Sequence, residues 1–359
     1  MLRYINQVNT VFMKATKAYA AQQANAPLTP FSFERRGVGP NDVQVEILYC
    51  GVCHSDLHQV KDEWGGSIFP MVPGHEIVGR VVKVGANVTK FKEGDLAGVG
   101  VMVDSCRVCK NCNQNLEQYC VEGMTGTYNA IERDGKTVAQ GGYSSQIVTD
   151  EKYVLKVSPK LDLKAVAPLL CAGITTYSPL RYVGVTKGTK VGVVGLGGLG
   201  HMAVKFAVSF GAEVTMLSTS KSKETDAKKL GAHKFALTTD KAAMEEYKSY
   251  FDVILNTVSA NHSYEDYLDL LDLNGKMVIV GLPPEASPVG AFKLLANRRS
   301  IIGSMIGGIE ETQEMLDYCA EHNIVADVEL IPMNYINEAY ERMIKNDVKY
   351  RFVLDLSTL

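Results

Sequence analysis

The sequence has little excess of charge of either sign and no long apolar run, and each absence excludes a class of protein. Its 37 Lys and Arg residues nearly balance its 40 Asp and Glu residues, so the formal net charge is −3. A dedicated nucleic-acid-binding protein would carry a strong basic excess. No apolar segment approaches the roughly 20 residues that span a bilayer. We therefore expect neither a nucleic-acid partner nor a membrane partner.

Cysteine is also scarce, and its distribution is uneven. The 359 residues include eight Cys, which is too few for a fold held together by disulfides. Four of them lie within residues 106–120, and such clustering indicates metal binding in a reducing compartment. The first residues lack the apolar core and small-residue cleavage site of a secretory signal. These observations predict a cytoplasmic enzyme.

The chain is long enough, and at 46% hydrophobic residues apolar enough, for about two domains. A strand pattern begins near Met13, so residues 1–12 are expected to be an upstream start or a poorly ordered segment. From there to about Tyr153, short β-rich runs alternate with turns, which is typical of an antiparallel barrel or sandwich. The strands expected here are 43–49, 77–84, 96–103 and 143–148.

The pattern changes near residue 165, where expected strands and helices begin to alternate. A helix-compatible segment at 163–180 comes first. Strands are expected at 190–194, 213–217, 234–237, 251–255, 276–280 and 300–304. Helices are expected at 199–210, between the second of these strands and residue 230, and at 310–321. This alternation predicts an α/β fold with a doubly wound parallel sheet of the Rossmann type.

The last apolar run, 350–355, is predicted to be a strand that rejoins the first domain. We therefore divide the chain into a catalytic domain at 1–159, a nucleotide-binding domain at 160–305 and a return to the catalytic domain at 306–359. Within the catalytic domain, residues 104–122 form a separate lobe that contains the four clustered cysteines.

A glycine-rich segment follows the first expected strand of the second domain. The pattern G-x-G-x-x-G is present as Gly195, Leu196, Gly197, Gly198, Leu199 and Gly200. Glycines there allow a tight turn and a close approach of the backbone to a pyrophosphate, which the helix N-terminus faces. The segment predicts a dinucleotide site; a glycine-rich turn without a ligand is the alternative.

The end of the second strand indicates which dinucleotide binds. NAD sites place an acidic residue there, about 20 residues after the glycines, to bind the ribose 2′-hydroxyl. Here the strand leads into Ser218, Thr219 and Lys223, and the first acid is Glu224. Hydroxyls and a lysine suit a 2′-phosphate as donors and counter-charge. We therefore expect NADP(H), with an ordinary polar turn as the alternative.

Residues 50–76 gather side chains that bind transition metals. They include Cys50, Cys53, His54, His58 and His75, together with carboxylates. Thiolates and imidazoles this close suit zinc better than calcium or magnesium. Cys50 and Cys53 also form a C-x-x-C, which in other proteins is a redox pair. That pair should open a helix, whereas Cys50 closes an expected strand.

Four further cysteines predict a second metal site. They are Cys106, Cys109, Cys112 and Cys120. Four thiolates on one short loop favour a structural zinc, because a complete tetrahedron leaves no position for a substrate. An iron–sulfur cluster or free thiols are the alternatives.

Together these features resemble the zinc-dependent medium-chain dehydrogenase/reductase family. Residues 74–88 carry the resemblance most specifically, because they are similar to the family's zinc alcohol dehydrogenase signature. The segments 50–58, 171–175 and 218–223 are similar to the cinnamyl alcohol dehydrogenase branch, which includes bacterial NADPH-dependent aldehyde reductases of broad substrate range. The resemblance covers nearly the whole chain and implies a GroES-like β-rich catalytic domain beside the Rossmann domain.

The resemblance implies two zinc ions per subunit, one catalytic and one structural. Cys53, His75 and Cys171 would hold the catalytic ion, and the four clustered cysteines would hold the structural one. Glu76 would lie behind the catalytic ion. Asp56 would hydrogen-bond His75 and fix its tautomer; an ordinary acid at a helix N-terminus is the alternative for Asp56.

The resemblance also implies the reaction, which is reversible reduction of aromatic and aliphatic aldehydes to primary alcohols with NADPH. A proton would pass through Ser55 to His58. Besides the glycine loop, the residues that would contact the cofactor are His54, Thr175, Ser218, Thr219, Lys223, Val280, Ser304 and Arg351. For His58 the alternative is a histidine at the surface or farther from the metal. For Arg351 the alternative is a plain surface or interdomain cation.

Two other functions are compatible with parts of the sequence. One is an NAD-dependent alcohol or polyol dehydrogenase, although a polyol-type relative would be expected to carry Glu in place of Cys171. The other is a non-catalytic zinc protein of the same fold, which would have lost metal ligands. Trp64, Tyr128 and Met305 could line a substrate pocket or belong to the core. Relatives imply a homodimer or a tetramer, paired through the strand at 300–306.

Overall fold

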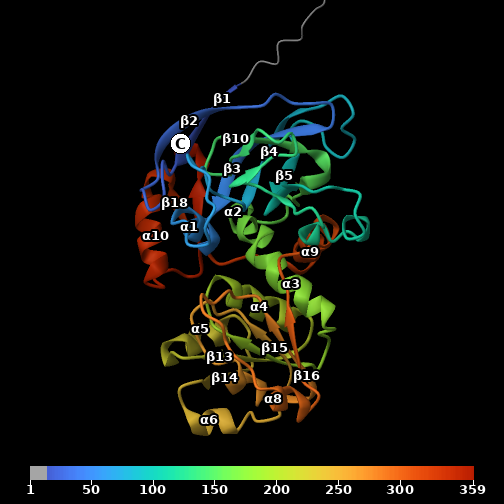
Figure 1. The fold of residues 1–359 in the computed structure, drawn as a ribbon, viewed down its shortest axis with the longest axis vertical. Coiled ribbons are helices and arrows are strands. Elements are labelled where there is room, and N and C mark those ends of the chain that lie inside the picture. The colour runs from blue at the N-terminus through green and yellow to red at the C-terminus, as the bar shows by residue number, and fades with distance from the viewer. Residues whose placement is uncertain (1–13) are drawn as a thin grey trace, which may run out of the picture.

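The computed structural model describes residues 14–359, which form two halves (Figure 1). The upper half is rich in antiparallel strands, and the lower half contains a parallel sheet covered by helices. Both parts of the predicted fold class are therefore present. The prediction about residues 1–12 lies outside the described residues. No helix within 14–359 is long and apolar enough to cross a membrane.

A seven-stranded sheet forms the centre of the upper half. Its strands lie in the order β11-β5-β4-β3-β19-β18, and β10 also pairs with β3. In β3 the side chains of Val43, Val45 and Ile47 are buried, as expected for alternate residues on the inner face of a strand. The strand bounds are β3 Asp42–Gly51, β4 Ile77–Val84, β5 Leu96–Val99, β10 Gln146–Asp150, β11 Leu155–Lys156, β18 Val328–Pro332 and β19 Arg351–Asp355.

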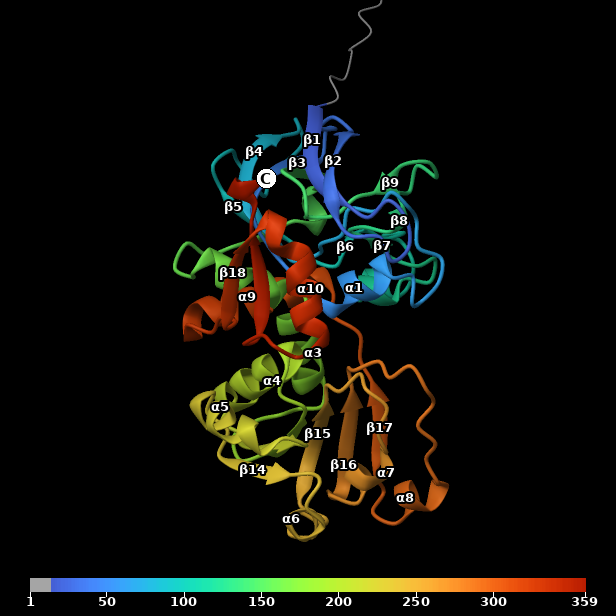
Figure 2. The same ribbon diagram turned by 90° about the vertical axis from the view of Figure 1, so that its left-hand side faces the viewer.

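Three two-stranded sheets and one helix complete the N-terminal part of this half. The paired strands are β1 Lys14–Ala20 with β2 Thr29–Arg35, β6 Met102–Asp104 with β7 Thr125–Gly126, and β8 Ala130–Ile131 with β9 Val138–Ala139. Helix α1, His54–Val60, begins soon after β3 ends. Figure 2 shows α1 and α10 in the upper half, above α3 and α4 of the lower half.

Six parallel strands form the sheet of the lower half, in the order β14-β13-β12-β15-β16-β17. Val191 and Val193 of β12 enter one apolar cluster and Val194 enters another, because helices cover both faces of the sheet. The strand bounds are β12 Lys190–Val194, β13 Glu213–Ser218, β14 Lys234–Leu237, β15 Phe251–Asn256, β16 Leu271–Ile279 and β17 Ser300–Gly303.

Helices lie between these strands and lead into the sheet. Their bounds are α2 Leu163–Val166, α3 Ala172–Tyr182, α4 Gly198–Ser209, α5 Glu224–Lys229, α6 Lys241–Glu245, α7 Glu265–Leu268 and α8 Ala291–Leu295. Strand β17 is the last strand at one edge of the sheet. The predicted alternation of strands and helices is therefore present throughout the lower half.

The C-terminal residues return to the upper half, as the sequence predicts. Helix α9, Ile309–His322, contacts both α3 and β11, and helix α10 covers Ile336–Ile344. Strand β19 pairs in parallel with β18 and antiparallel with β3. Because α9 contacts elements of both halves, the domain boundaries at residues 159/160 and 305/306 stay predictions.

The structure corrects several predicted elements. The expected strand 96–103 is two strands, interrupted at Gly100 and Val101. The expected helical segment 163–180 is broken by Cys171, whose φ of −130° and ψ of −71° are not helical. The strand expected at 143–148 starts only at Gln146. Helices α1 and α10 and strand β18 are additional elements that were not predicted. Helix α10 was missed although its buried residues Ile336, Ala339, Tyr340 and Met343 recur at helical spacing.

Candidate active site and metal centres

One buried cluster of metal-binding side chains lies at the junction of the two halves. It consists of Cys53, His75, Glu76 and Cys171, whose ligand atoms all lie within 4.8 Å of one another. Cys53 precedes α1, His75 and Glu76 precede β4, and Cys171 directly precedes α3. The first three come from the upper half, whereas Cys171 leads into a helix that packs on the lower half.

The spacing of the two thiols fits a metal rather than a disulfide. The Sγ atoms of Cys53 and Cys171 are 3.8 Å apart. A disulfide needs about 2.05 Å, whereas two thiolates at about 2.3 Å from a tetrahedral zinc lie about 3.8 Å apart. The imidazole of His75 supplies a third donor. The chain therefore carries a donor set and a thiol spacing that fit zinc.

The carboxylate of Asp56 orients two of these ligands at once. Its Oδ1 accepts hydrogen bonds from His75 Nδ1 at 3.0 Å and from the backbone N–H of Gly74 at 3.1 Å. Its Oδ2 accepts from the backbone N–H of Cys53 at 2.9 Å and from the Tyr143 hydroxyl at 3.2 Å. Asp56 therefore both hydrogen-bonds His75 and lies as an acid in the first turn of α1, so the two predicted roles are combined.

Glu76 lies on the other side of the cluster and faces a cation. Both of its carboxylate oxygens are buried without a hydrogen-bond partner, and Arg351 Nη2 forms an ion pair with Oε1 at 3.4 Å. Burial raises the pKa of Glu76 to about 7, with Arg351 acting in the opposite direction. Arg351 is only 4% exposed, so it is not a surface cation, whereas its role as a cofactor contact or as an interdomain cation stays a prediction.

Arg351 also reaches the glycine loop. A Cβ atom added to Gly198 would lie 2.7 Å from Arg351 Nε, so a larger residue would force this guanidinium to move. The Nε atom is itself buried without a hydrogen-bond partner. A buried donor left unpaired is costly, and an anionic group bound between Arg351 and the glycine loop would satisfy it.

The glycine loop has the geometry that the sequence predicts. Gly195 has φ of +89°, and a Cβ on Gly200 would lie 1.9 Å from the carbonyl oxygen of Gly195. Helix α4 then begins at Gly198. A cleft is lined by Leu196, Gly197 and Gly198 of this loop together with Val52, His54, Lys223 and Arg351. Leu199 differs, because it packs against the apolar core of the lower half.

The segment after β13 contains one lysine that forms no ion pair with the described residues and could therefore bind a phosphate. Lys221 and Lys228 both form ion pairs with Glu224, at 2.6 and 2.9 Å. Lys223 has no ion-pair partner among residues 14–359 and lines the same cleft as the glycine loop. The hydroxyl of Ser218 accepts a hydrogen bond from the backbone N–H of Ser220 at 3.2 Å, so it also orders this turn.

The remaining cofactor candidates lie at strand ends and in α3. Val280 follows β16 and Ser304 follows β17, so both lie at the carboxyl ends of neighbouring parallel strands, where such sheets bind ligands. Thr175 is in α3, one turn after Cys171, and its N–H donates to the Cys171 carbonyl at 3.0 Å. Thr219 is exposed at the end of β13.

The two predicted relay residues lie on α1. Ser55 Oγ is 3.7 Å from Cys53 Sγ, which places the hydroxyl beside the metal cluster. The side chain of His58 is 30% exposed, and its Nδ1 hydrogen-bonds Glu63 Oε2. The His58 ring also lies 5.1 Å, centroid to centroid, from the ring of Trp64. Sequence reasoning missed Glu63, because it lies beyond the end of α1 and follows no motif.

His54 lies between Cys53 and Ser55 in the sequence. Its side chain lines the same cleft as the glycine loop, and burial lowers its pKa. Of the three candidates for a substrate pocket, Tyr128 is buried and stacks on the metal-cluster residue His75, at 5.8 Å between ring centroids. Trp64 and Met305 are about half exposed. The structure therefore places only Tyr128 in contact with the cluster.

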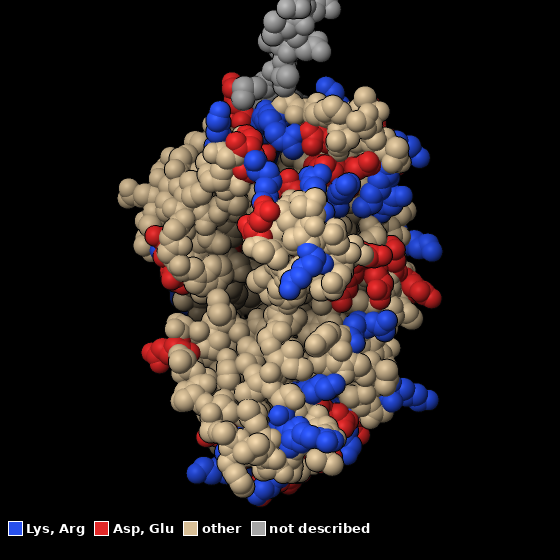
Figure 3. Space-filling view, turned by 45° about the vertical axis from the view of Figure 1, so that its right-hand side comes forward, with Lys and Arg blue, Asp and Glu red and all other residues tan. Residues whose placement is uncertain are grey.

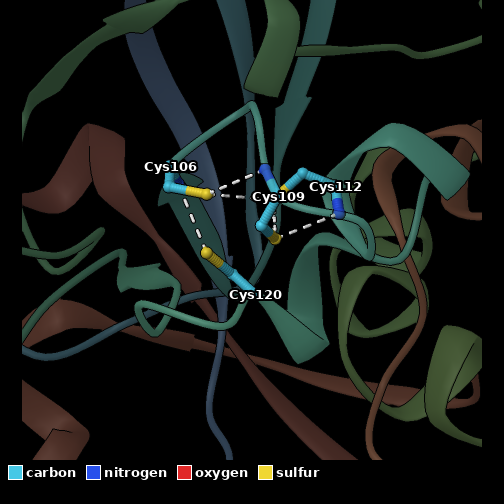
Figure 4. Close-up of side chains that lie close together, drawn as sticks. All are labelled: Cys106, Cys109, Cys112 and Cys120. Carbon is cyan, nitrogen blue, oxygen red and sulfur yellow. Dashed lines mark hydrogen bonds between the residues drawn. The ribbon is translucent and has the colours of Figure 1, made fainter.

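The second cluster contains the four clustered cysteines (Figure 4). Cys112 Sγ lies 3.9 Å from Cys106 Sγ and 3.5 Å from Cys109 Sγ, again close to the edge of a zinc tetrahedron. Backbone N–H groups of Cys106 and Cys109 point at the sulfurs of Cys120 and Cys106, each at 3.3 Å. Such donors favour the thiolate form that binds a metal. The loop is therefore suited to a closed structural zinc site.

Comparisons with known proteins agree with this geometry. Residues 39–159 match the family model of the alcohol dehydrogenase GroES-like domain, and residues 198–321 match that of the zinc-binding dehydrogenase. The NADP-dependent alcohol dehydrogenase C 1 of Mycolicibacterium smegmatis is 56% identical over 97% of this chain and 99% of the relative. The aldehyde reductase YahK of Escherichia coli is also 56% identical, over 97% and 99%.

A solved structure is similar over the same length. It is the CAD from Helicobacter pylori complexed with NADP(H), with a TM-score of 0.90 and 44% identity over 96% of this chain and 99% of that chain. The similarity therefore includes both halves of the chain.

The contacts of Asp56 predict the effect of removing its charge. In Asp56→Asn, the amide can no longer accept from both His75 and the two backbone N–H groups. We expect the affinity of this cluster for zinc to fall about 10- to 100-fold. After dialysis against a chelator, the variant should retain less zinc per subunit than the wild type treated in the same way, measured by atomic emission.

The matched control for this prediction is Asp240→Asn, because Asp240 only caps the exposed helix α6. That variant should retain as much zinc per subunit as the wild type. Retention of both ions by Asp56→Asn would contradict the role given to this carboxylate.

Proposed function

The chain belongs to the zinc-binding medium-chain alcohol dehydrogenase family, and from this we propose that it reduces aldehydes to primary alcohols with NADPH, reversibly. The observation that carries the proposal is that Arg351 contacts Glu76 of one metal cluster and also lies against Gly198 of the glycine loop. A cofactor on the loop and a substrate at the cluster would thus be brought together. The test is consumption of NADPH with a panel of aromatic and aliphatic aldehydes.

Cys53, His75 and Cys171 would hold the catalytic zinc, and the four clustered cysteines would hold a structural one. When bound, the catalytic zinc supplies Lewis acidity toward a carbonyl oxygen. Glu76 lies beside these ligands. Its ion pair with Arg351 lets the buried carboxylate and the buried guanidinium compensate each other's charge. Burial of the whole cluster excludes water and strengthens the electrostatic interactions within it.

A proton must reach the substrate oxygen after hydride transfer. Ser55 is the nearest hydroxyl on α1 to the cluster, and His58 lies one turn further along the same helix toward solvent. We propose that Ser55 donates the proton and that His58, held by Glu63, exchanges it with solvent. A histidine suits this exchange because its ordinary pKa is close to neutral.

The proposed choice of NADP(H) rests on the turn after β13. An acidic residue there would repel a 2′-phosphate. The nearest acid, Glu224, already pairs with Lys221 and Lys228, and Asp226 pairs with Lys349. Lys223 is left to bind the 2′-phosphate, with Ser218 and Thr219 as hydroxyl donors. Thr175, Val280 and Ser304 would contact the nicotinamide half, and His54 would face the pyrophosphate beside Arg351.

We also propose the compartment, the kind of partner and the oligomeric state of the enzyme. All eight cysteines are free, which supports a reducing, cytoplasmic compartment. Acidic and basic side chains are interspersed over the face shown in Figure 3, which supports a small-molecule substrate rather than a nucleic acid. A second copy would pair along the open edge at β17 to form a homodimer.

We expect Lys223→Ala to lower kcat/KM for NADPH about 10- to 100-fold, because a charge-assisted hydrogen bond to the 2′-phosphate is lost. The value for NADH should stay unchanged. The control is Lys221→Ala, which removes a neighbouring lysine that Glu224 already neutralises. Equal losses with NADPH and NADH in Lys223→Ala would rule out this assignment.

For Ser55→Ala we expect kcat to fall about 100-fold or more, since proton transfer by a positioned group contributes 10²–10⁴-fold. The zinc content should remain two per subunit. Ser67→Ala is the control, because Ser67 follows α1 and its hydroxyl donates only to the Gln59 carbonyl. A near-normal kcat in Ser55→Ala would remove this hydroxyl from the relay.

A further inference from the structure

The lobe that contains the four clustered cysteines touches the segment that follows the last strand of the parallel sheet. This segment, Ser304–Gly308, connects β17 to α9, and we call it the connecting loop. The Tyr119 hydroxyl accepts a hydrogen bond from the backbone N–H of Met305 at 3.1 Å. Glu117 Oε2 accepts from the backbone N–H of Ile309, also at 3.1 Å. Two side chains of the lobe thus hold both ends of the connecting loop.

The contact is close as well as polar. A Cβ atom on Gly308 would lie 1.8 Å from the carbonyl oxygen of Asn115 and 2.8 Å from Glu117 Oε2, so only glycine fits there. The Asn115 side chain also hydrogen-bonds Glu310 in the first turn of α9. Figure 1 shows the lobe, drawn in teal, beside α9. The connecting loop is therefore fitted to the lobe rather than merely near it.

The backbone of the connecting loop has an unfavourable conformation. Ile306 has φ of +40°, and its side chain is buried. A positive φ is unusual for a β-branched residue, and such a conformation persists only where the surroundings hold it. The hydrogen bonds that Met305 N–H donates to Tyr119 and Ile309 N–H donates to Glu117 flank this residue on both sides.

The opposite side of the connecting loop packs against α3, the helix that follows Cys171. A Cβ on Gly307 would lie 2.7 Å from the side chain of Ile174 in α3. The same helix begins after Cys171 and carries Thr175. Ser304, at the other end of the loop, lies at the carboxyl end of β17, where parallel sheets bind ligands. The loop is thus held between the lobe and the helix that follows Cys171.

We propose that Glu117 and Tyr119 are positioning residues, through which the four-cysteine lobe holds the connecting loop against the nicotinamide half of the cofactor. This inference rests on the proposed function. Cys112 and Cys120 bracket residues 115–119, so a metal on these thiols fixes the segment that carries both side chains. The lobe would then act on cofactor binding at the other end of the loop, and not only on stability.

The test measures the two halves of the cofactor separately. Glu117→Ala and Tyr119→Phe should each raise the Kd and KM for NADPH about five- to tenfold and change kcat less than about twofold. Binding of adenosine 2′,5′-bisphosphate, which lacks the nicotinamide half, should be unchanged because Lys223 and the glycine loop are intact. Glu117→Gln keeps an acceptor oxygen and should restore most of the affinity for NADPH.

The control is Glu122→Ala, because Glu122 belongs to the same lobe but pairs with Arg133 and does not touch the connecting loop. It should bind NADPH as the wild type does. Zinc content and Tm are measured on every variant. If Glu117→Ala loses the lobe zinc, Tyr119→Phe decides the question, since it removes one hydroxyl and leaves the fold of the lobe unchanged.

Two results would overturn the proposal. One is wild-type affinity for NADPH in Tyr119→Phe with the lobe zinc retained. The other is an equal loss of affinity for NADPH and for adenosine 2′,5′-bisphosphate, which would indicate a general loosening of the fold. Failure of the proposed function is distinguishable, because then the wild-type protein itself would not reduce aldehydes with NADPH.

Discussion

A buried ion pair between Glu76 and Arg351 joins the two sites on which the proposed chemistry depends. Glu76 belongs to the metal cluster, and Arg351 lies against the glycine loop. Removing one partner of such a pair leaves an uncompensated buried charge and costs about 3–5 kcal/mol. The pair therefore couples the last strand of the chain, β19, to the integrity of both the metal site and the cofactor site.

This coupling explains why the C-terminal residues cross back to the first half. Strand β19 lies between β3 and β18 in the central sheet, and the register with β3 places Arg351 at the junction. From the other side, Cys171 enters the same junction at a non-helical residue between two helical segments. The site is therefore completed by residues from four separate parts of the chain.

The sequence predicted the local parts of this arrangement well. The glycine loop, the four-cysteine lobe and the turn after β13 are each defined by residues close together in the chain, so spacing alone identifies them. Cys171 could not be found in that way, because it lies 118 residues from Cys53 and no spacing rule relates them. The pairing of His58 with Glu63 and the contact of Tyr119 with Met305 depend on how loops fold back, which local propensity does not specify.

We propose that Cys53, His75 and Cys171 hold one zinc ion at the junction and that the four clustered cysteines hold another. Anomalous scattering at the zinc absorption edge, from crystals of the protein grown with NADP(H), decides whether both ions are present. We expect two peaks per subunit, one of them about 2.3 Å from the sulfurs of Cys53 and Cys171. A single peak at the lobe, with no scatterer between Cys53 and Cys171, would contradict it.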